Sequence, residues 1–480
     1  MERYDLVVIG GGTAGLVAAA GGASLGAKVA LVERDKLGGE CLHRGCVPTK
    51  ALVKSARVAR LVNRAEEFGV KTGGVEVDFP AVMERMRRVI ETVGEGDDPD
   101  RFRKMGVALF LEQEAYLDSP HEVAVDGRRL ETRSVIVATG SHPSVPPISG
   151  IEEVGYLTYV EALELEKLPS SIVIVGSGPV GSEFAQIFAR FGARVILIDA
   201  APHPLPIEDR EVGEALERCL EADGVTFLGG YKVEEARFED GEKVLVARSE
   251  RGEKIEARDE EVLLALGCEP TVDGLRLENA GVELGNGGLK VDENLKTTAP
   301  SVYAAGDVTG IYPFTHVAEY QRRIALRNAL FPAKSKADHE VVPWATFTDP
   351  EVAMVGLTEE EARERHGHVR VFRQPFGGID RGVANGETDG FVKIVTGRRG
   401  RILGGHVIGP EAGNLIHEIV LAMRKNVPIQ DLSTTIHVYP TLSLANQRAV
   451  DSYYREKLFT DRNRKVLSAF FGLRRRLSRS

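Results

Sequence analysis

Two of the four cysteines of this chain, Cys41 and Cys46, lie five positions apart in the stretch GGECLHRGCVPTK, residues 38–50. A close pair of cysteines can bind a metal, form a structural disulfide or work as a redox dithiol. A structural zinc site needs four nitrogen or sulfur ligands, and Cys219 and Cys268 are too far apart in the sequence to form a second close pair. A structural disulfide would be reduced in a cytosolic protein. The pattern therefore favours a redox-active pair.

The spacing of the pair also limits its geometry. Residues five apart on a regular helix have Cα atoms roughly 8–9 Å from each other, whereas a disulfide needs Cα atoms within about 7 Å. A bridged form therefore requires a distorted backbone, which Gly45 and Pro48 are suited to produce. A strained or exposed disulfide is easier to reduce than a relaxed one.

A glycine-rich segment precedes the cysteine pair. Residues 5–34 read as a β-branched strand, then Gly10, Gly12 and Gly15, then an alanine-rich helix and a second strand that ends at Glu33. In a GxGxxG turn the glycines allow the tight turn, the close approach of a pyrophosphate and the packing of helix on strand. The helix N-terminus faces the phosphates, and the acid accepts hydrogen bonds from a ribose. We expect a dinucleotide-binding βαβ unit here.

The same construction returns at residues 171–199. Gly176, Gly178 and Gly181 repeat the glycine spacing, and Asp199 follows its third glycine at the same distance as the acid of the first copy. Two copies predict two bound dinucleotides.

Asp199 also bears on the choice of nicotinamide cofactor. An acid at the end of the second strand favours a free 2′-hydroxyl and repels a 2′-phosphate, which favours NADH over NADPH. The nearby Arg210 could weaken this preference if it turned towards the ribose.

The composition limits the class of protein. At 480 residues the chain is too long for one hydrophobic core, so we expect about three domains. Its 43% hydrophobic and 28% charged residues are typical of a globular protein, and its net charge of −10 gives no general support for binding nucleic acid. The N-terminal sequence lacks the pattern of a signal peptide, and no run approaches the roughly 18 apolar residues of a membrane span. We expect a cytoplasmic protein.

Together these motifs resemble a known family. GGECLHRGCVPTK, placed between two GxGxxG units, is similar to the class I pyridine nucleotide–disulfide oxidoreductases, or flavoprotein disulfide reductases. That group includes dihydrolipoyl dehydrogenase, glutathione reductase and mercuric reductase. The resemblance implies an FAD- and NAD(P)H-dependent enzyme that works as a homodimer. It also implies an α/β fold with two Rossmann-like domains, one for FAD and one for NAD(P), and a C-terminal α+β dimerisation domain.

The resemblance and the composition together predict five segments. They are a first part of the FAD domain at 1–148, an NAD(P) domain at 149–270, a return to the FAD domain at 271–340, a dimerisation domain at 341–460 and a basic C-terminal tail at 461–480.

The resemblance also implies roles for residues around the cysteine pair. Cys46 would lie under the flavin ring as the charge-transfer thiolate, and Cys41 would be the interchange thiol that meets the substrate. Lys50 would lie near the flavin N5 and pair with Glu183 beside the nicotinamide site. A nearby cation such as Lys50 can lower a thiol pKa, and FAD carries electrons from the nicotinamide to the disulfide.

Further FAD contacts follow from two more motifs of the same family. SVIVATG, with Thr139 and Gly140, is similar to the strand that closes the first half of the FAD domain. SVYAAGDV, with Gly306 and Asp307, is similar to the second FAD motif, whose aspartate binds the ribityl–phosphate side. His316 would lie along the flavin edge, although a histidine of the core is an equal reading.

The C-terminal segment departs from the thiol reductases. Their His-x-His-Pro-Thr motif and its following glutamate supply the acid–base histidine for thiol exchange, whereas this chain reads IHVYPTLSLANQ. His437 matches the first histidine, Tyr439 replaces the catalytic one and Leu444 replaces the glutamate. A phenol with a pKa near 10 is a poor proton acceptor at neutral pH. His437 remains a possible substitute, because two residues apart on a strand point the same way.

This departure favours a mercuric-reductase-like enzyme that passes electrons to a small-molecule or metal-ion acceptor without a resident metal. Thiolates suit soft metal ions, and a tyrosine hydroxyl can assist without acting as a base. Mercuric reductases also end in a cysteine pair, which this chain lacks beyond Cys268. The alternatives are dihydrolipoyl dehydrogenase of a 2-oxoacid dehydrogenase complex, an NAD(P)H:quinone or dye reductase, and a redox-sensing flavoprotein without turnover.

The last segment, DRNRKVLSAFFGLRRRLSRS, extends beyond the resemblance. Phe470, Phe471 and Leu473 lie beside arginines and could touch an anionic membrane or a partner protein. The favoured reading is a frayed, solvated tail, which makes membrane contact the less expected outcome.

Overall fold

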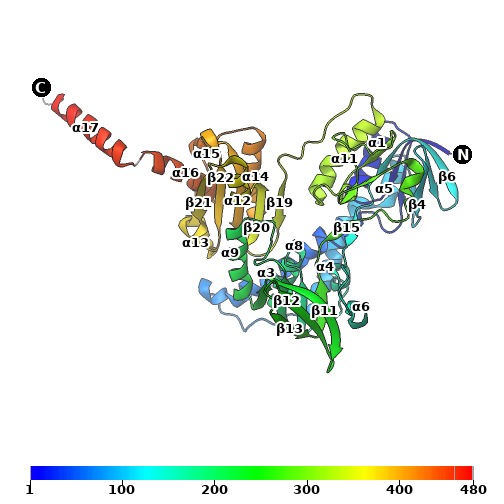
Figure 1. Cartoon of the computed structure of the whole chain (residues 1–480), viewed down its shortest axis with the longest axis horizontal. Helices are drawn as coiled ribbons and strands as arrows, with labels where there is room; N and C mark the ends of the chain where they lie inside the picture. The colour runs from blue at the N-terminus through cyan, green and yellow to red at the C-terminus, as the bar shows by residue number, and fades with distance from the viewer. Residues whose placement is uncertain (1, 459, 478–480) are drawn as a thin grey trace. The chain divides into compact units, whose positions relative to one another are not determined.

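The computed structural model describes residues 2–458 and 460–477, so the last three residues of the predicted tail, 478–480, lie outside the described residues. The chain divides into two compact units, and Figure 1 labels many of their helices and strands. The first unit comprises Met1–Pro202 and Asp223–His339, and the second comprises His203–Ala222 and Glu340–Ser480.

The first unit contains a seven-stranded sheet that begins the predicted FAD domain. Its strand order is β3-β2-β1-β6-β5-β4, with β18 also paired to β6. The strands β1, β2, β3, β6 and β18 run parallel, and β4 and β5 form an antiparallel extension. The strand bounds are β1 Glu2–Ile9, β2 Val29–Glu33, β3 Val107–Leu111, β4 Ala115–Ser119, β5 Glu122–Val125, β6 Arg128–Val137 and β18 Val302–Ala304.

A second parallel sheet in the same unit has the order β10-β9-β8-β14. Every residue of β8 is buried, as expected for a central strand that is covered on both faces, and its residues Val173 and Val175 share a core with β11, β12 and β13. A three-stranded antiparallel sheet, β11-β12-β13, and the short pairs β7–β15 and β16–β17 complete the strands of the unit. The bounds are β7 Ser141–Pro143, β8 Ser171–Val175, β9 Arg194–Asp199, β10 Val225–Gly229, β11 Tyr231–Glu239, β12 Glu242–Ser249, β13 Lys254–Asp259, β14 Glu261–Leu264, β15 Cys268–Pro270, β16 Leu284–Gly285 and β17 Gly288–Leu289.

Two helices of this unit start directly after the two glycine-rich turns. Helix α1 follows β1, and helix α8 follows β8, so each turn opens a helix at the carboxyl end of a parallel strand. The α-helices of the unit are α1 Thr13–Ser24, α2 Gly39–His43, α3 Cys46–Asn63, α4 Phe79–Gly94, α5 Pro99–Lys104, α6 Ile151–Val154, α7 Tyr159–Ala162, α8 Pro179–Phe191, α10 Leu277–Ala280 and α11 Thr315–Leu330.

The second unit is built on a five-stranded antiparallel sheet of order β19-β20-β23-β22-β21. Its core joins apolar side chains of the sheet to those of α14, α15 and α16. The strands are β19 Pro343–Thr346, β20 Glu351–Gly356, β21 Arg370–Pro375, β22 Phe391–Thr396 and β23 Ile402–Gly409, and the α-helices are α9 Arg210–Ala222, α12 Glu359–His366, α13 Asp380–Asn385, α14 Ala412–Arg424, α15 Ile429–Thr434, α16 Leu444–Leu458 and α17 Asp461–Leu477.

Two parallel sheets in one unit and an antiparallel α+β unit confirm the predicted fold class. Among the described residues, no helix is both long enough and apolar enough to cross a bilayer.

Candidate active site

The backbone between the two cysteines leaves the helical conformation. Cys41 lies in the short helix α2, and Cys46 is the first residue of α3. Between them Gly45 has φ −113° and ψ −109°, and a Cβ there would lie 3.2 Å from the carbonyl oxygen of Glu40 and 3.4 Å from the Cα of Cys41. Pro48 is the third residue of α3, where its missing N–H breaks no helical bond. The break occurs at the glycine for which the sequence predicted a distortion.

The two thiols have opposite proton affinities. Both cysteines are free, and the thiol of Cys41 donates a hydrogen bond to the sulfur of Cys46. That bond, a contact of 3.4 Å between the Cys46 Sγ and the Thr315 Oγ1, and the charge of Lys50 lower the pKa of Cys46 to about 6. The same hydrogen bond raises the pKa of Cys41. In the reduced pair at neutral pH, Cys46 therefore carries the thiolate and Cys41 keeps its proton.

A salt bridge links the helix of Cys46 to the second nucleotide fold. The Nζ of Lys50 on α3 lies 3.0 Å and 2.9 Å from the two carboxylate oxygens of Glu183 on α8, and 3.3 Å from the Oγ1 of Thr49. Glu183 is only 4% exposed, so its buried carboxylate on α8 is paired with the ammonium group of Lys50. The structure thus brings together four residues that the sequence singled out, namely Cys41, Cys46, Lys50 and Glu183.

The two glycine-rich turns have the same local geometry. Gly10 and Gly176 have φ of +106° and +101°, a region that L side chains rarely adopt. A Cβ on Gly15 would lie 1.8 Å from the carbonyl oxygen of Gly10, and a Cβ on Gly181 would lie 1.8 Å from that of Gly176. Each third glycine therefore lets a helix pack against the turn that precedes it.

The helix N-termini that follow these turns suit phosphates. Gly12 and Gly178 are the N-caps of α1 and α8, and among the described residues no side chain caps either helix. A Cβ built on Gly178 would meet no described atom within 4 Å, and one on Gly12 would meet only the Cα of Gly39, at 3.7 Å. Uncapped N–H groups that face free space at a helix N-terminus are a binding site for a pyrophosphate. The residues present therefore fit FAD at α1 and NAD(P)H at α8.

An acid is held at the end of the second strand in each fold. Glu33 accepts hydrogen bonds from the backbone N–H of Gly11 at 2.5 Å and of Asp35 at 2.6 Å. Asp199 accepts from the backbone N–H of Ser177 at 2.5 Å and of Ala201 at 2.8 Å. Both carboxylates are thereby fixed next to the glycine-rich turn, where a ribose would lie.

Arg210, which could have favoured NADPH, forms a salt bridge of 2.8 Å with Glu214 within α9. This bond occupies the guanidinium Nε.

The predicted flavin-side residues lie at contacts between distant segments. The Oγ1 of Thr139 donates to the carbonyl of Thr271 at 2.6 Å, and the backbone N–H of Thr271 donates to the carbonyl of Gly140 at 2.9 Å. The backbone N–H of Gly306 donates to the side chain of Gln321 at 2.8 Å. The two bonds to Thr271 join the segment after β6 to the returning chain, and the bond of Gly306 lies within the returning chain.

Asp307 accepts a hydrogen bond of 2.9 Å from the hydroxyl of Ser141, and burial raises its pKa. His316 stacks on Phe314 with ring centroids 5.4 Å apart, at the start of α11.

Three polar residues of the site were missed from the sequence. Thr315 contacts the sulfur of Cys46, and Ser141 contacts Asp307. Glu40 precedes Cys41 directly, and burial together with the charge of Asp307 raises its pKa to about 7. Glu40 lies inside the cysteine motif, so the sequence could have indicated it as a site residue. No local sequence pattern indicates Thr315 or Ser141 as site residues.

The departing C-terminal residues belong to the second unit. The hydroxyl of Tyr439 donates to the Oδ2 of Asp380 at 2.9 Å, and this bond raises the pKa of Tyr439. The ring of His437 contacts the Oε1 of Glu418 through Nε2 at 2.9 Å and the carbonyl of Thr435 through Nδ1 at 3.0 Å.

The expectation that His437 and Tyr439 share one face of a strand is wrong. The segment between α15 and α16 is irregular, so the two side chains turn to different partners. Leu444, at the start of α16, is 7% exposed and packs in the core of the second unit. An apolar core position explains why a leucine is stable where the thiol reductases have a glutamate.

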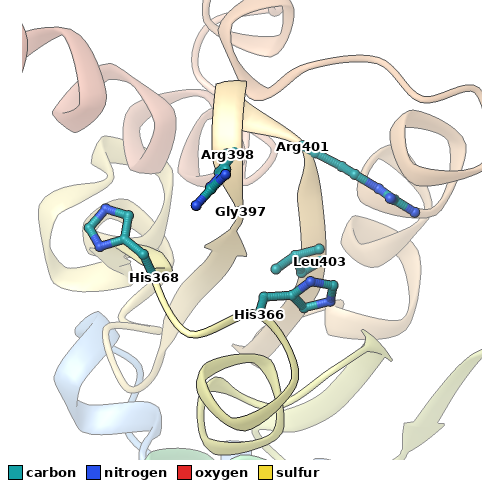
Figure 2. Close-up of a pocket in the computed structure, with 6 residues that line it drawn as sticks. All are labelled: His366, His368, Gly397, Arg398, Arg401 and Leu403. Carbon is teal, nitrogen blue, oxygen red and sulfur yellow. The ribbon is translucent and has the colours of Figure 1, made fainter.

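A separate pocket opens on the surface of the second unit. Figure 2 shows its two histidines, His366 at the end of α12 and His368 just after it, and its two arginines on the connection between β22 and β23. Its volume is about 230 Å³, and its lining residues are His366, His368, Gly397, Arg398, Arg401 and Leu403. This basic pocket is distinct from the predicted site residues.

Comparison with known proteins decides the family. Residues 4–321 match the family described as pyridine nucleotide-disulphide oxidoreductase, and residues 342–450 match its dimerisation domain. The chain belongs to this family. Its assignment as an FAD- and NAD(P)H-dependent oxidoreductase is therefore confirmed, and the dimerisation domain supports a homodimer.

Individual relatives cover almost the whole chain. A dihydrolipoyl dehydrogenase of Bacillus subtilis is 36% identical over 456 residues, which are 92% of this chain and 96% of the relative. A mercuric reductase of Bacillus cereus is 32% identical over 456 residues, which are 94% of this chain and 72% of the relative. The flavoprotein disulfide reductase RclA of Escherichia coli, solved as a Cu(II) complex, matches with a TM-score of 0.84 at 28% identity and covers 94% of this chain and 99% of its own.

Proposed function

We propose that this oxidoreductase passes electrons from NADH through FAD to the Cys41–Cys46 pair and from there to a thiophilic metal ion. The single observation that carries the proposal is that both C-terminal candidates are engaged by other groups: the hydroxyl of Tyr439 donates to Asp380, and both ring nitrogens of His437 contact oxygen atoms of Glu418 and Thr435. The proposal assigns FAD to residues 1–148 and 271–340 and the nicotinamide to residues 149–270. It places the enzyme in the cytoplasm, where thiols remain reduced.

Tyr439 and His437 fail as bases for different reasons. The bond to Asp380 keeps the phenol of Tyr439 protonated, because ionisation would place two negative charges side by side. Both ring nitrogens of His437 lie against oxygen atoms of its own unit, Nε2 against the carboxylate of Glu418 and Nδ1 against the carbonyl of Thr435, so each nitrogen already has a partner. The proposed acceptor reaction therefore proceeds without an imidazole base.

Proton balance distinguishes the acceptors. Reduction of a disulfide RSSR by NADH consumes one proton from solution and gives two thiols, so its second half needs proton delivery to each leaving sulfur. Reduction of mercuric ion, NADH + Hg²⁺ → NAD⁺ + H⁺ + Hg⁰, and of two cupric ions, NADH + 2Cu²⁺ → NAD⁺ + H⁺ + 2Cu⁺, deliver no proton to the acceptor. A metal-ion acceptor thus requires no residue that transfers a proton to it.

The residues around the pair have separable roles in this reaction. Bound FAD supplies the two-electron carrier between nicotinamide and disulfide. Lys50 stabilises the thiolate of Cys46, and Glu183 fixes Lys50. Cys41 and Cys46 offer two sulfur ligands, which suit soft ions such as Hg²⁺ and Cu⁺. Asp199 would select NADH by accepting from the ribose 2′-hydroxyl.

Two relatives support a metal acceptor. One is a mercuric reductase, and RclA has been solved with Cu(II). In this chain, the described residues contain no group of three or more histidine, cysteine or acidic side chains that could hold a metal. We therefore treat the metal as a substrate at the cysteine pair.

Steady-state turnover of NADH with mercuric ion, cupric ion, lipoamide, glutathione disulfide and a quinone tests the proposal. We expect turnover with a metal ion that is lost in Cys41→Ser and kept in Cys219→Ser, a control on α9. Faster turnover with lipoamide than with either metal ion would overturn the proposal and favour dihydrolipoyl dehydrogenase. That second candidate is supported by the 36% identity to the Bacillus subtilis enzyme. Quinone turnover that persists in Cys41→Ser would favour a quinone reductase.

A further inference from the structure

The C-terminal segment beyond the dimerisation domain forms a helix. The family match ends at residue 450, and α17, Asp461–Leu477, follows it (Figure 1). The predicted frayed tail is therefore wrong for the described residues of this segment. Seventeen residues of helix arrange side chains by face, which a frayed tail cannot do.

One face of α17 is apolar and exposed. Val466, Phe470, Leu473 and Leu477 recur at the i, i+4, i+7 and i+11 positions, which form one stripe along a helix. Val466, Phe470 and Leu473 are 61%, 55% and 60% exposed. The neighbouring Leu467 and Phe471 widen this stripe on one side, at 47% and 49% exposed. We call these six residues the apolar stripe of α17.

The rest of the helix is basic. Between 461 and 477 the sequence has six basic residues and one acid, Asp461, in a chain whose net charge is −10. At 100° per residue, Arg464, Lys465 and Arg475 fall on the side opposite the apolar stripe, together with Asp461, Ser468 and Gly472. Arg474 falls within the stripe, between Phe470 and Leu467. The helix therefore combines an apolar stripe with a polar face on which basic residues outnumber the one acid, Asp461.

We propose that α17 docks the enzyme on an anionic lipid surface, lying in the plane of the interface. An apolar stripe with phenylalanine and leucine enters the boundary between headgroups and acyl chains, and lysine and arginine on the other face bind anionic headgroups. The helix does not qualify as a membrane span. The inference concerns attachment and is independent of which acceptor the cysteine pair reduces.

Charge favours lipid over another copy of this helix. Pairing two α17 helices through their apolar stripes would bring their basic residues together, and like charges across an interface repel. An anionic membrane offers both an apolar layer and the opposite charge. The net charge of the whole chain is −10, so α17 carries a local positive charge that differs in sign from that of the chain as a whole.

Co-sedimentation of the holoenzyme with lipid vesicles tests the proposal. The probes are phosphatidylcholine vesicles with and without about 30% phosphatidylglycerol. We expect binding to the anionic vesicles, little binding to the neutral ones, and release when sodium chloride rises from about 0.1 M to about 0.5 M. A Phe470→Trp variant should also show a blue shift of its added emission on the anionic vesicles, beyond any change from Trp344.

Two pairs of variants separate the apolar and charge contributions. Phe470→Ser with Leu473→Ser should lower the partition coefficient at least about tenfold, because two large apolar side chains no longer enter the bilayer. Lys465→Glu with Arg475→Glu, both on the polar face, should lower it by about the same factor. Exposed residues of the first unit supply matched controls, namely Phe238→Ser and the pair Arg133→Glu with Arg251→Glu. The partition coefficient of these control variants should stay within about twofold of the parent's.

Other results would overturn the proposal. They are no binding of the parent to anionic vesicles, equal binding to neutral vesicles, or unchanged binding of both α17 pairs. A further contrary result is a parent that fails to bind vesicles while the double variant Phe470→Ser with Leu473→Ser forms a smaller oligomer in solution than the parent. In that case the apolar stripe packs against a second copy of the chain, and the lipid proposal is wrong.

Discussion

The ammonium group of Lys50 contacts both carboxylate oxygens of Glu183, at 3.0 Å and 2.9 Å. The contact connects α3, which starts at Cys46, with α8, which starts at the second glycine-rich turn. Lys50 lowers the pKa of Cys46, and the charge of Glu183 raises it. The hydrogen bond from Cys41 lowers the pKa of Cys46 most, and the ion pair adjusts the thiolate content further through two opposed charges.

Opposite shifts of the Cys46 pKa are expected from the two halves of this ion pair. Lys50→Met removes the cation and should raise the pKa from about 6 by about 1 pH unit, whereas Glu183→Gln should lower it. The thiolate exists above the pKa, so the long-wavelength thiolate–flavin absorbance of the two-electron-reduced enzyme should disappear as the pH falls through about 6 in the parent. A pH titration of this band checks the sign in each variant. Shifts of both variants in the same direction would contradict the opposed-charge account.

Asp199 should control the nicotinamide preference. Asp199→Ala removes the acceptor for the ribose 2′-hydroxyl and the repulsion of a 2′-phosphate, so kcat/KM for NADH should fall about tenfold and the NADPH to NADH ratio should rise. Steady-state kinetics with both nucleotides measure this ratio. Glu33→Ala, at the matching position of the first fold, should instead weaken FAD retention and leave the ratio unchanged. An unchanged ratio in Asp199→Ala would remove Asp199 from the specificity site.

Local sequence patterns were sufficient for the two glycine-rich turns. Steric limits within a few residues dictate a GxGxxG turn, so Gly10 and Gly176 adopt nearly the same φ and the acids Glu33 and Asp199 both bond back to their turns. The break at Gly45 was predictable for the same reason.

Contacts between distant segments were not predictable in this way. Thr315 reaches the sulfur of Cys46 across 269 positions, and Ser141 reaches Asp307 across 166. Such pairs depend on how whole elements pack, and no local pattern encodes them. We expected His437 and Tyr439 on a strand, but the described segment between α15 and α16 is irregular. A strand needs a neighbouring strand to pair with, and the local sequence does not show whether one is present.

Glu208 should make the stability of the second unit depend on pH. It is 7% exposed and accepts a hydrogen bond from the Nε1 of Trp344 at 2.6 Å. Burial raises its pKa to about 7, and the charge of the adjacent Asp209 adds to this. The folded state therefore holds a proton that the unfolded chain, with a glutamate pKa of about 4.3, releases. The stability contributed by this proton is complete below about pH 4 and is lost as the pH rises to about 7.

Glu208→Gln should remove this dependence. The amide stays neutral and its oxygen can still accept from Trp344, so the free energy of unfolding at pH 8 should rise by about 2 kcal/mol and change little at pH 4. Urea unfolding followed by the emission of Trp344, the one tryptophan in the sequence, measures the difference. Glu221→Gln on α9, which is exposed, is the matched control. A gain of equal size at both pH values would contradict the assigned proton.

Tyr439 and His437 should respond differently to replacement. The hydroxyl of Tyr439 donates its proton to Asp380 yet keeps oxygen lone pairs, and the side chain is 66% exposed, so it can contact a metal ion. Tyr439→Phe should therefore lower kcat/KM for the metal ion about tenfold and leave the rate of flavin reduction by NADH unchanged. Because Asp380 raises the Tyr439 pKa, the pH profile of the parent's metal-ion reduction should show no step below pH 10 from this group.

His437→Asn removes a ring whose two nitrogens contact Glu418 and Thr435, so it should lower thermal stability while metal-ion reduction stays within about threefold. Stopped-flow flavin reduction, steady-state metal-ion reduction and a thermal melt separate the two effects. A large loss of metal-ion reduction in His437→Asn with an unchanged melt would show that the histidine acts in the acceptor reaction after all.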